Sequence, residues 1–189
     1  MRMLIVGAGA LGGYYGAHLH RAGRDITFLV HLRRAEQIAR DGLRIVSPNG
    51  DFAVPARTVL AGDIAAPFET VLVATKAYSL EQAMDDFAPA VGSTTVILPI
   101  LNGMAHLDML SARFGADHVL GGVGRVGATL DDEGRVLHVR NDSRLALEFG
   151  ELSGGLSDRT RALAAFFDGV GFKADANAWI LLDFTRADP

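Results

Sequence analysis

Short apolar runs recur along the first hundred residues, and helical segments separate them. Four runs contain only apolar or β-branched residues, at 3–6, 26–30, 70–74 and 95–98. Such runs are typical of strands buried on both faces of a parallel sheet. Helical patterns lie between and after them, at 10–22, 33–41, 79–87 and 105–114. Ser79 and Gln82 predict a capping box at the start of the third helix. The alternation predicts an α/β protein, doubly wound around a mostly parallel sheet.

The pattern changes after Gly115. Residues 119–130 are glycine-rich and β-like, and we expect 134–139 to pair with 145–149 across Asn141-Asp142. A turn-rich segment also joins 43–46 to 52–54 as a hairpin, and 57–60 is a further candidate strand. An amphipathic helix at 158–167 and a short strand at 171–174 follow. We therefore expect antiparallel strands to be added to the parallel sheet, mainly in the C-terminal half.

The first strand runs directly into Gly7-Ala8-Gly9-Ala10-Leu11-Gly12, which has the spacing G-x-G-x-x-G. Gly7 allows a tight turn out of the strand, Gly9 lets the backbone approach a pyrophosphate, and Gly12 lets the new helix lie close to the sheet. The helix N-terminus then points its amides at the phosphates. A glycine-rich turn without a ligand is the alternative, but the strand before and the helix after favour a Rossmann-type dinucleotide site.

The end of the second strand indicates which dinucleotide binds. NAD-binding proteins of this type carry an acid there, which holds the ribose 2′-hydroxyl. This chain has His31-Leu32-Arg33-Arg34 instead, and the first acid is Glu36. Guanidinium groups pair with phosphate in a two-pronged geometry, so the missing acid together with Arg33 and Arg34 predicts NADP(H). His31 beside them is a further candidate cofactor-binding residue. In the alternative interpretation, the two arginines only begin a solvated helix.

Two further strand ends carry polar residues suited to chemistry. Thr75 and Lys76 follow the strand at 70–74, and Asn102 follows the strand at 95–98. Ligands of open α/β sheets bind at this carboxyl edge. The Lys76 ammonium suits a ribose, a substrate carboxylate or proton transfer, although a plain surface lysine is equally compatible. The Asn102 amide suits a hydroxyl or keto oxygen, or it caps the following helix.

The composition excludes several other classes. The net charge is −4 and the pI is about 5.8, without a basic block, so we expect no nucleic-acid partner. There is no cysteine, and the six histidines show no metal-binding spacing, so we expect no metal. The first strand begins almost at once and no apolar run reaches membrane-spanning length. We therefore expect no membrane association and a cytoplasmic location.

Three segments together resemble a known family. These are the glycine motif with Gly13, then Val73-Ala74-Thr75-Lys76-Ala77-Tyr78, then Leu101-Asn102-Gly103-Met104. In this order and spacing they resemble the 2-dehydropantoate 2-reductases (ketopantoate reductases), over roughly residues 1 to 180. The resemblance implies an oxidoreductase in which NADPH reduces ketopantoate, a 2-keto acid, to pantoate on the route to pantothenate and coenzyme A. It places Lys76 and Asn102, with Thr75, near nicotinamide and substrate. The arginine that the family commonly has after the second strand is replaced by His31.

The chain departs from this family near its end. The family continues into a helical domain of about another hundred residues, a usual domain size, whose first helix carries a general-acid lysine two residues after a tryptophan. Trp179 matches the tryptophan, but Leu181 occupies the lysine position. We therefore expect an NADP-binding domain over 1–176 and a remnant of a helical domain over 177–189, with impaired catalysis. The alternative is a stand-alone, non-catalytic NADP(H)-binding module, sensor or subunit.

The segment 177–184 is apolar, and the resemblance implies that the helical domain would cover it. Exposed apolar clusters mark interfaces. We expect a homo-oligomer, namely a dimer through 177–184, or a tail folded back on the sheet.

Overall fold

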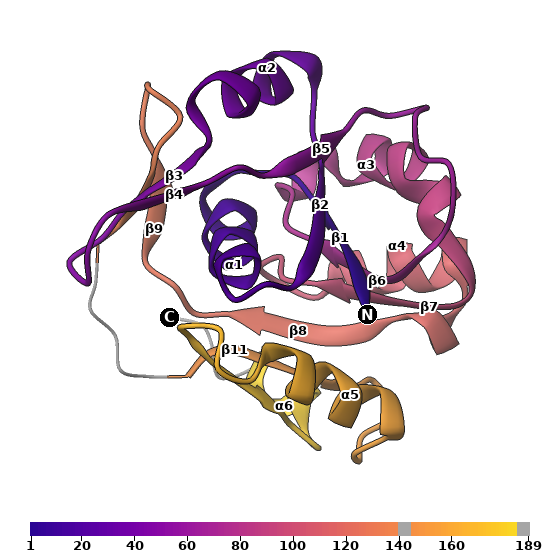
Figure 1. The fold of residues 1–189 in the computed structure, drawn as a ribbon. Coiled ribbons are helices and arrows are strands. Elements are labelled where there is room, and N and C mark those ends of the chain that lie inside the picture. Colours follow the sequence, from indigo (N-terminus) through magenta and orange to yellow (C-terminus); the bar gives the residue numbers. More distant parts are fainter. Residues whose placement is uncertain (140–144, 185–189) are drawn as a thin grey trace.

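The computed structural model describes residues 1–139 and 145–184. Its centre is a five-stranded parallel sheet in the order β5-β2-β1-β6-β7 (Figure 1). The strands are β1 (Arg2–Val6), β2 (Asp25–Leu29), β5 (Arg57–Val59), β6 (Phe68–Val73) and β7 (Val91–Pro99). This order places the carboxyl ends of β1, β2, β6 and β7 at one edge, which confirms the predicted doubly wound α/β architecture.

Helices cover both faces of this sheet. They are α1 (Ala10–Arg21), α2 (Leu32–Asp41), α3 (Leu80–Phe87) and α4 (Ala105–Phe114), with 3₁₀ turns at Ala77–Ser79, Ala88–Ala90 and Ala116–His118. Strand β1 shows why its sequence is continuously apolar: Met3 and Ile5 enter the core beneath α1, whereas Leu4 and Val6 enter the core beneath α3 and α4. Alternate residues of a central strand thus meet opposite faces.

Two smaller sheets flank the parallel one. A four-stranded sheet has the order β4-β3-β10-β9 and a three-stranded sheet the order β12-β11-β8. Their strands are β3 (Leu43–Val46), β4 (Phe52–Val54), β8 (Leu120–Gly124), β9 (Ala128–Leu130), β10 (Val136–His138), β11 (Leu145–Glu151) and β12 (Lys173–Ala176). The predicted hairpin of β3 with β4 is confirmed, and so are added antiparallel pairs.

The predicted pairing of 134–139 with 145–149 is wrong. Strand β10 pairs with β3 and β9, and β11 pairs with β8 and β12. The reason is burial: Val136 lies against Gly13 of α1, and Leu147 is fully buried in the same core. Long-range packing thus overrode a local turn signal. The expected turn at Asn141-Asp142 lies outside the described residues.

The predicted capping box at Ser79 and Gln82 is also wrong. Ser79 occupies the N-cap position of α3 but makes no side-chain cap bond, because it closes the preceding 3₁₀ turn. The Gln82 side chain donates to Asp86 instead, at 2.9 Å. A complete capping box does form further on, between Ser157 and Thr160, at the start of α5 (Asp158–Phe167).

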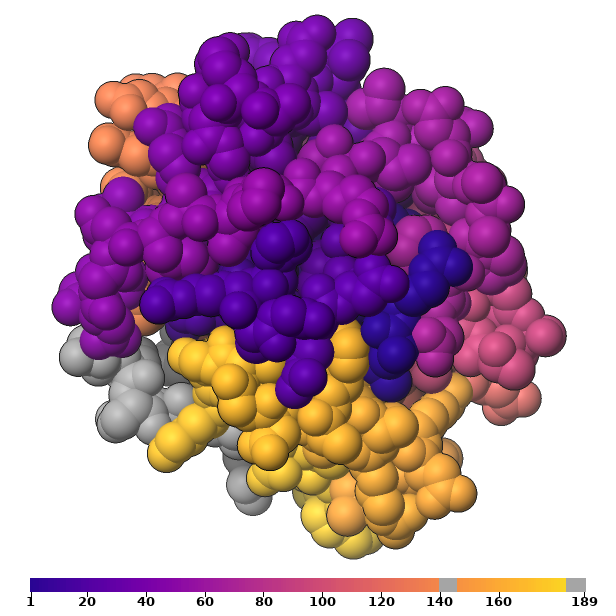
Figure 2. Space-filling view, in the orientation of Figure 1, coloured from indigo at the N-terminus to yellow at the C-terminus, as the bar shows by residue number. Residues whose placement is uncertain are grey.

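The C-terminal part packs beneath the N-terminal part, as the space-filling view shows for α5 (Figure 2). Arg24, just before β2, fastens α5 by donating to the carbonyls of Phe166 and Asp168, both at 2.9 Å. Helix α6 (Ile180–Phe184) lies against β8 and β11 and buries Ile180 completely, while Trp179 is 69% exposed. The segment thus folds back on the sheet, one of the two expected outcomes. None of the described helices is long and apolar enough to cross a membrane.

Candidate functional site

The glycine loop between β1 and α1 has the geometry that its spacing predicts. Gly7 has a φ of 95°, a left-handed conformation that favours glycine. A side chain at Gly12 would overlap the carbonyl oxygen of Gly7 and lie 3.0 Å from the Cβ of Ala74. A Cβ at Gly9, in contrast, would meet nothing within 4 Å. Gly7 and Gly12 therefore shape the turn, whereas Gly9 leaves open space beside it.

The N-terminus of α1 faces this open space. Gly9 is the N-cap residue, no side chain caps the helix, and the first turn carries no acid. The first backbone N–H groups of a helix have no partner within the helix, and its dipole places partial positive charge there. Ala10, Leu11 and Gly12 begin this first turn. The loop thus meets the two requirements of an anion site at a helix N-terminus, free amides and close backbone approach.

A cavity of about 510 Å³ extends from the glycine loop toward α3. It brings together the ends of β1 and β2, the residues after β6, and one side of α3. The hydroxyl oxygen of Thr75 is buried in its wall without a hydrogen-bond partner in the described part of the chain. A cavity with an anion-binding loop and an unpaired hydroxyl fits an extended phosphate-containing ligand such as a dinucleotide. Its lining includes Gly7, Ala8, Gly9, Val30, His31, Arg34, Thr75, Tyr78, Ser79, Gln82, Ala83, Asp86 and Leu130.

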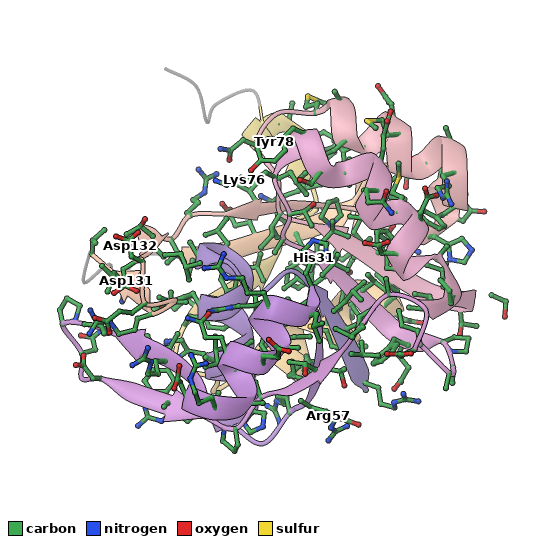
Figure 3. The ribbon with its side chains drawn as sticks, turned by 90° about the horizontal axis from the view of Figure 1, so that it is seen from above. His31, Arg57, Lys76, Tyr78, Asp131 and Asp132 are labelled. Carbon is green, nitrogen blue, oxygen red and sulfur yellow. The ribbon has the colours of Figure 1, made fainter. Side chains whose placement is uncertain are left out.

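A second cavity, of about 650 Å³, lies between α2 and the turn that joins β9 to β10. The two cavities share His31, Arg34 and Leu130. The second one has three arginines and three carboxylates in its lining, so its charge is mixed rather than strongly positive. These are Arg33, Arg34, Arg40, Glu36, Asp131 and Asp132. Figure 3 shows His31 toward the centre and the two aspartates farther out, on the turn.

The guanidinium of Arg34 donates hydrogen bonds to acceptors within the protein. Its Nε and Nη2 both donate to the carbonyl oxygen of Ala8, at 3.1 and 2.9 Å. Its Nη1 donates to Gln37 at 2.6 Å and to the carbonyl of Gly134 at 2.9 Å. Burial lowers the pKa of this guanidinium below its ordinary value. Arg34 thus uses four of the five N–H groups of an arginine side chain on protein acceptors.

His31 and Arg33, two of the predicted cofactor-binding residues, lie at the start of α2. His31 follows β2 directly as the N-cap of α2, and Arg33 lies in the first turn of that helix. Both are exposed and line the second cavity.

Lys76 and Asn102 lie at neighbouring strand ends. Val73 of β6 is in register with Pro99 of β7, and each of the two residues follows three positions later. Both side chains are exposed, and the N-cap of α4 is Met104, so Asn102 does not cap that helix. Figure 3 shows Lys76 beside Tyr78 at this edge. An ammonium and an amide at adjacent strand ends can bind a carboxylate and a carbonyl oxygen of one small molecule.

Leu181 has a structural role. It is partly buried and packs against the core beneath α3 and α4. A hydrocarbon side chain there supplies neither a proton nor a charge. Among the described residues, no group of three or more His, Asp or Glu side chains is arranged to hold a metal ion.

The sequence analysis did not predict several residues that line the two cavities. Ser79, Gln82, Ala83 and Asp86 lie on one stripe of α3, with the spacing i, i+3, i+4 and i+7. This helical periodicity, directly after a strand that ends at the ligand edge, could have identified them. Leu130 at the end of β9 and Asp132 in the turn after it lie about a hundred residues from α2 in the sequence, and no local pattern predicts their approach.

The comparisons with known proteins agree with this architecture. The family described as Ketopantoate reductase PanE/ApbA matches residues 3–154. "Uncharacterized oxidoreductase YkpB" of Bacillus subtilis is 41% identical over 170 residues, which cover 90% of this chain and 55% of that protein. The crystal structure of 2-dehydropantoate 2-reductase from Geobacter metallireducens has a TM-score of 0.84 at 34% identity, over 94% of this chain and 58% of that one.

A third similarity shows the fold alone. The ternary structure of D-mandelate dehydrogenase with NADH and anilino(oxo)acetate has a TM-score of 0.87, but the identity is 23% over 98% of this chain and 60% of that one. The chain thus spans little more than half the length of the relatives it matches. Its family match covers the glycine loop, Lys76 and Asn102 together. The chain belongs to the ketopantoate reductase PanE/ApbA family of oxidoreductases.

Proposed function

We propose that this chain is the NADP(H)-binding part of a 2-dehydropantoate 2-reductase-like oxidoreductase. The observation that carries the proposal is a contrast within the glycine loop. An added Cβ would overlap the Gly7 carbonyl at Gly12, but it would meet only open space at Gly9. This space lies at the N-terminus of α1, which no side chain caps, so a pyrophosphate can approach the backbone amides there. The family membership and the cavity that continues toward α3 support the same proposal.

The preference for NADP(H) over NAD(H) rests on the residues after β2. No acid directly follows Val30, while His31 is exposed where the two cavities meet and Arg33 is exposed in the second cavity. A guanidinium binds a phosphate dianion through charge-assisted hydrogen bonds. Asp132 on the facing turn opposes this effect, whereas the Asp131 carboxylate is paired with Arg135 at 2.7 Å. Of the residues predicted for the 2′-phosphate, His31 and Arg33 have the freer side chains.

The reaction proposed for the whole protein is reduction of a 2-keto acid such as ketopantoate. The bound nicotinamide supplies the hydride. Lys76 and Asn102 then have complementary tasks: the amide of Asn102 orients the keto oxygen, and the ammonium of Lys76 stabilises the negative charge that develops on it. Leu181 cannot donate a proton, so Lys76 is the described side chain at this edge best suited to that task. We therefore propose that the chain by itself catalyses this step poorly.

A second candidate is a non-catalytic NADP(H)-binding module, sensor or subunit. The packing of Leu181 into the core favours it, because this position is structural here.

In both proposals residues 1–176 form the nucleotide-binding unit, residues 177–189 begin a further part, and the protein is cytoplasmic. The exposed side chains of Trp179 and Leu182 support a dimer through 177–184, which sedimentation would test. A monomer at high concentration would contradict the dimer.

The direct experiment is a titration with NADPH and with NADH, followed by an assay with ketopantoate. The reductase proposal expects tight NADPH binding and NADPH oxidation that depends on ketopantoate, however slow. The module proposal expects the same binding without oxidation. Absence of binding to either nucleotide would refute both.

A further inference from the structure

Arg34 joins three segments that are far apart in the sequence. It contacts the glycine loop at Ala8, helix α2 at Gln37, and the β9–β10 turn at Gly134. The separations along the chain are 26 residues to Ala8 and 100 residues to Gly134. An arginine that served only as a phosphate ligand would have no need for these partners.

The β9–β10 turn is itself well ordered by hydrogen bonds. The Asp131 carboxylate accepts from the backbone N–H groups of Glu133 and Arg135, at 3.1 and 2.8 Å. The Glu133 carbonyl accepts from Gln37 at 2.7 Å, next to the Gly134 carbonyl that accepts from Arg34. The turn thus offers two carbonyls in a row as a fixed support for α2 side chains.

Gly134 shows how closely this support fits. It has a φ of 73°, and a Cβ at this position would overlap the side chains of both Gln37 and Arg34. The positive φ favours glycine, and a Cβ here would force the ends of these two side chains to move. The guanidinium of Arg34 is held on one side by this turn, and its other side reaches the Ala8 carbonyl with two N–H groups.

We infer that Arg34 is a positioning residue for the glycine loop rather than a ligand of the 2′-phosphate. It fixes the Ala8 carbonyl, and therefore the peptide plane that leads into Gly9, while it keeps a positive charge beside the anion site. This charge and this geometry act on the pyrophosphate, which NADPH and NADH share. Arg34 thus strengthens binding of both dinucleotides, and Arg33 is left to discriminate between them. The inference rests on the proposed dinucleotide binding.

The test compares Arg34→Met with Arg33→Met, which change adjacent residues in the same way. The probes are NADPH, NADH and ADP, because ADP carries the pyrophosphate without a 2′-phosphate. We expect Arg34→Met to weaken all three by the same factor, about tenfold or more, because the Ala8 carbonyl loses both hydrogen bonds from Arg34 and the anion site loses the nearby positive charge. Arg33→Met is expected to weaken NADPH alone. A loss confined to NADPH in Arg34→Met would overturn the inference.

A measurement on the ligand-free protein separates positioning from direct contact. We expect hydrogen exchange of the backbone amides of residues 7–12 to become faster in Arg34→Met and to stay unchanged in Arg33→Met. Arg34→Lys keeps the charge but not the two-pronged contact, so the faster exchange is expected to persist. Unchanged exchange in both Arg34 variants would overturn the inference.

Gly134→Ala provides a second variant if Arg34→Met fails to fold. It leaves Arg34 in the chain but displaces its side chain, so the loop amides are expected to exchange faster and all three ligands to bind more weakly. Unchanged exchange and binding in this variant would contradict the inference. If the unmutated protein binds none of the probes, the proposed function fails, and the exchange measurements still decide the role of Arg34.

Discussion

The glycine loop and the strand edge at Lys76 and Asn102 differ in how far the protein completes them. The loop is fixed by the close packing of Gly12 on the Gly7 carbonyl and by the two hydrogen bonds from Arg34 to the Ala8 carbonyl. Lys76 and Asn102, in contrast, are exposed side chains at the ends of β6 and β7. The part proposed for binding is thus preorganised within this chain, while the part proposed for catalysis is open. Binding is therefore expected to survive where turnover does not.

The largest expected effect concerns ketopantoate reduction by the unmodified chain. A positioned general acid typically contributes 10²–10⁴-fold, and orientation of the substrate contributes about 7–11 kcal/mol. Because Leu181 donates nothing and the catalytic edge is open, we expect turnover far below the ordinary range of roughly 1–10³ s⁻¹. NADPH oxidation with ketopantoate measures it. An ordinary rate that Lys76→Ala abolishes would contradict the expectation that the open strand edge catalyses poorly. It would also identify Lys76 as the general acid.

The second prediction concerns a substitution that blocks the preorganised glycine loop. Gly9→Val should abolish NADPH binding and leave the fold intact, because a side chain there fills open space. Gly12→Ala is the matched control: its added methyl overlaps the Gly7 carbonyl, so it should lower the melting temperature. Nucleotide titration and thermal unfolding of both variants measure the two effects. If Gly9→Val binds NADPH with unchanged affinity, the loop is only a turn.

The third prediction tests whether Arg33 makes the protein prefer NADPH over NADH. One charge-assisted hydrogen bond contributes about 1.5–3 kcal/mol, so Arg33→Ala should weaken NADPH by about tenfold or more and leave NADH nearly unchanged. Arg40→Ala, on the same helix and in the same cavity, serves as the control for a general loss of positive charge. Equal affinity of the unmutated protein for NADH and NADPH would contradict a phosphate site at Arg33.

The fourth prediction concerns the stability of the fold and involves α1, the helix behind the loop. Burial, helped by His138 and Arg21, lowers the pKa of His18 from 6.5 to about 4. The unfolded chain therefore binds this proton more readily, so stability is complete above pH 6.5 and decreases as the pH falls toward 4. His18→Gln should flatten that part of the pH–stability curve, measured by urea unfolding. An equally steep curve in the variant would show that other groups cause the decrease.

The sequence predicted those features that depend on neighbouring residues. The continuous apolar runs identified β1, β2, β6 and β7, and the glycine spacing identified the loop. It did not predict the partners of β10, because the burial of Val136 against α1 depends on a contact more than a hundred residues away. The contacts of Arg34 could not be predicted for a related reason: its spacing placed it after β2, but only the fold shows the Ala8 and Gly134 carbonyls around its guanidinium.

The strand order also has a consequence for the order of folding. Strands β1 and β2 are joined by α1 alone, whereas β1 reaches β6 across an intervening stretch that separates Arg2 from Glu69 by 67 residues. Closing the longer loop costs more chain entropy, so we expect β1, α1 and β2 to associate before β6 docks. Leu72→Ala should then mainly accelerate unfolding, whereas Ile26→Val should slow folding. In that case the glycine loop acquires its shape before the strand edge at Lys76 and Asn102 exists.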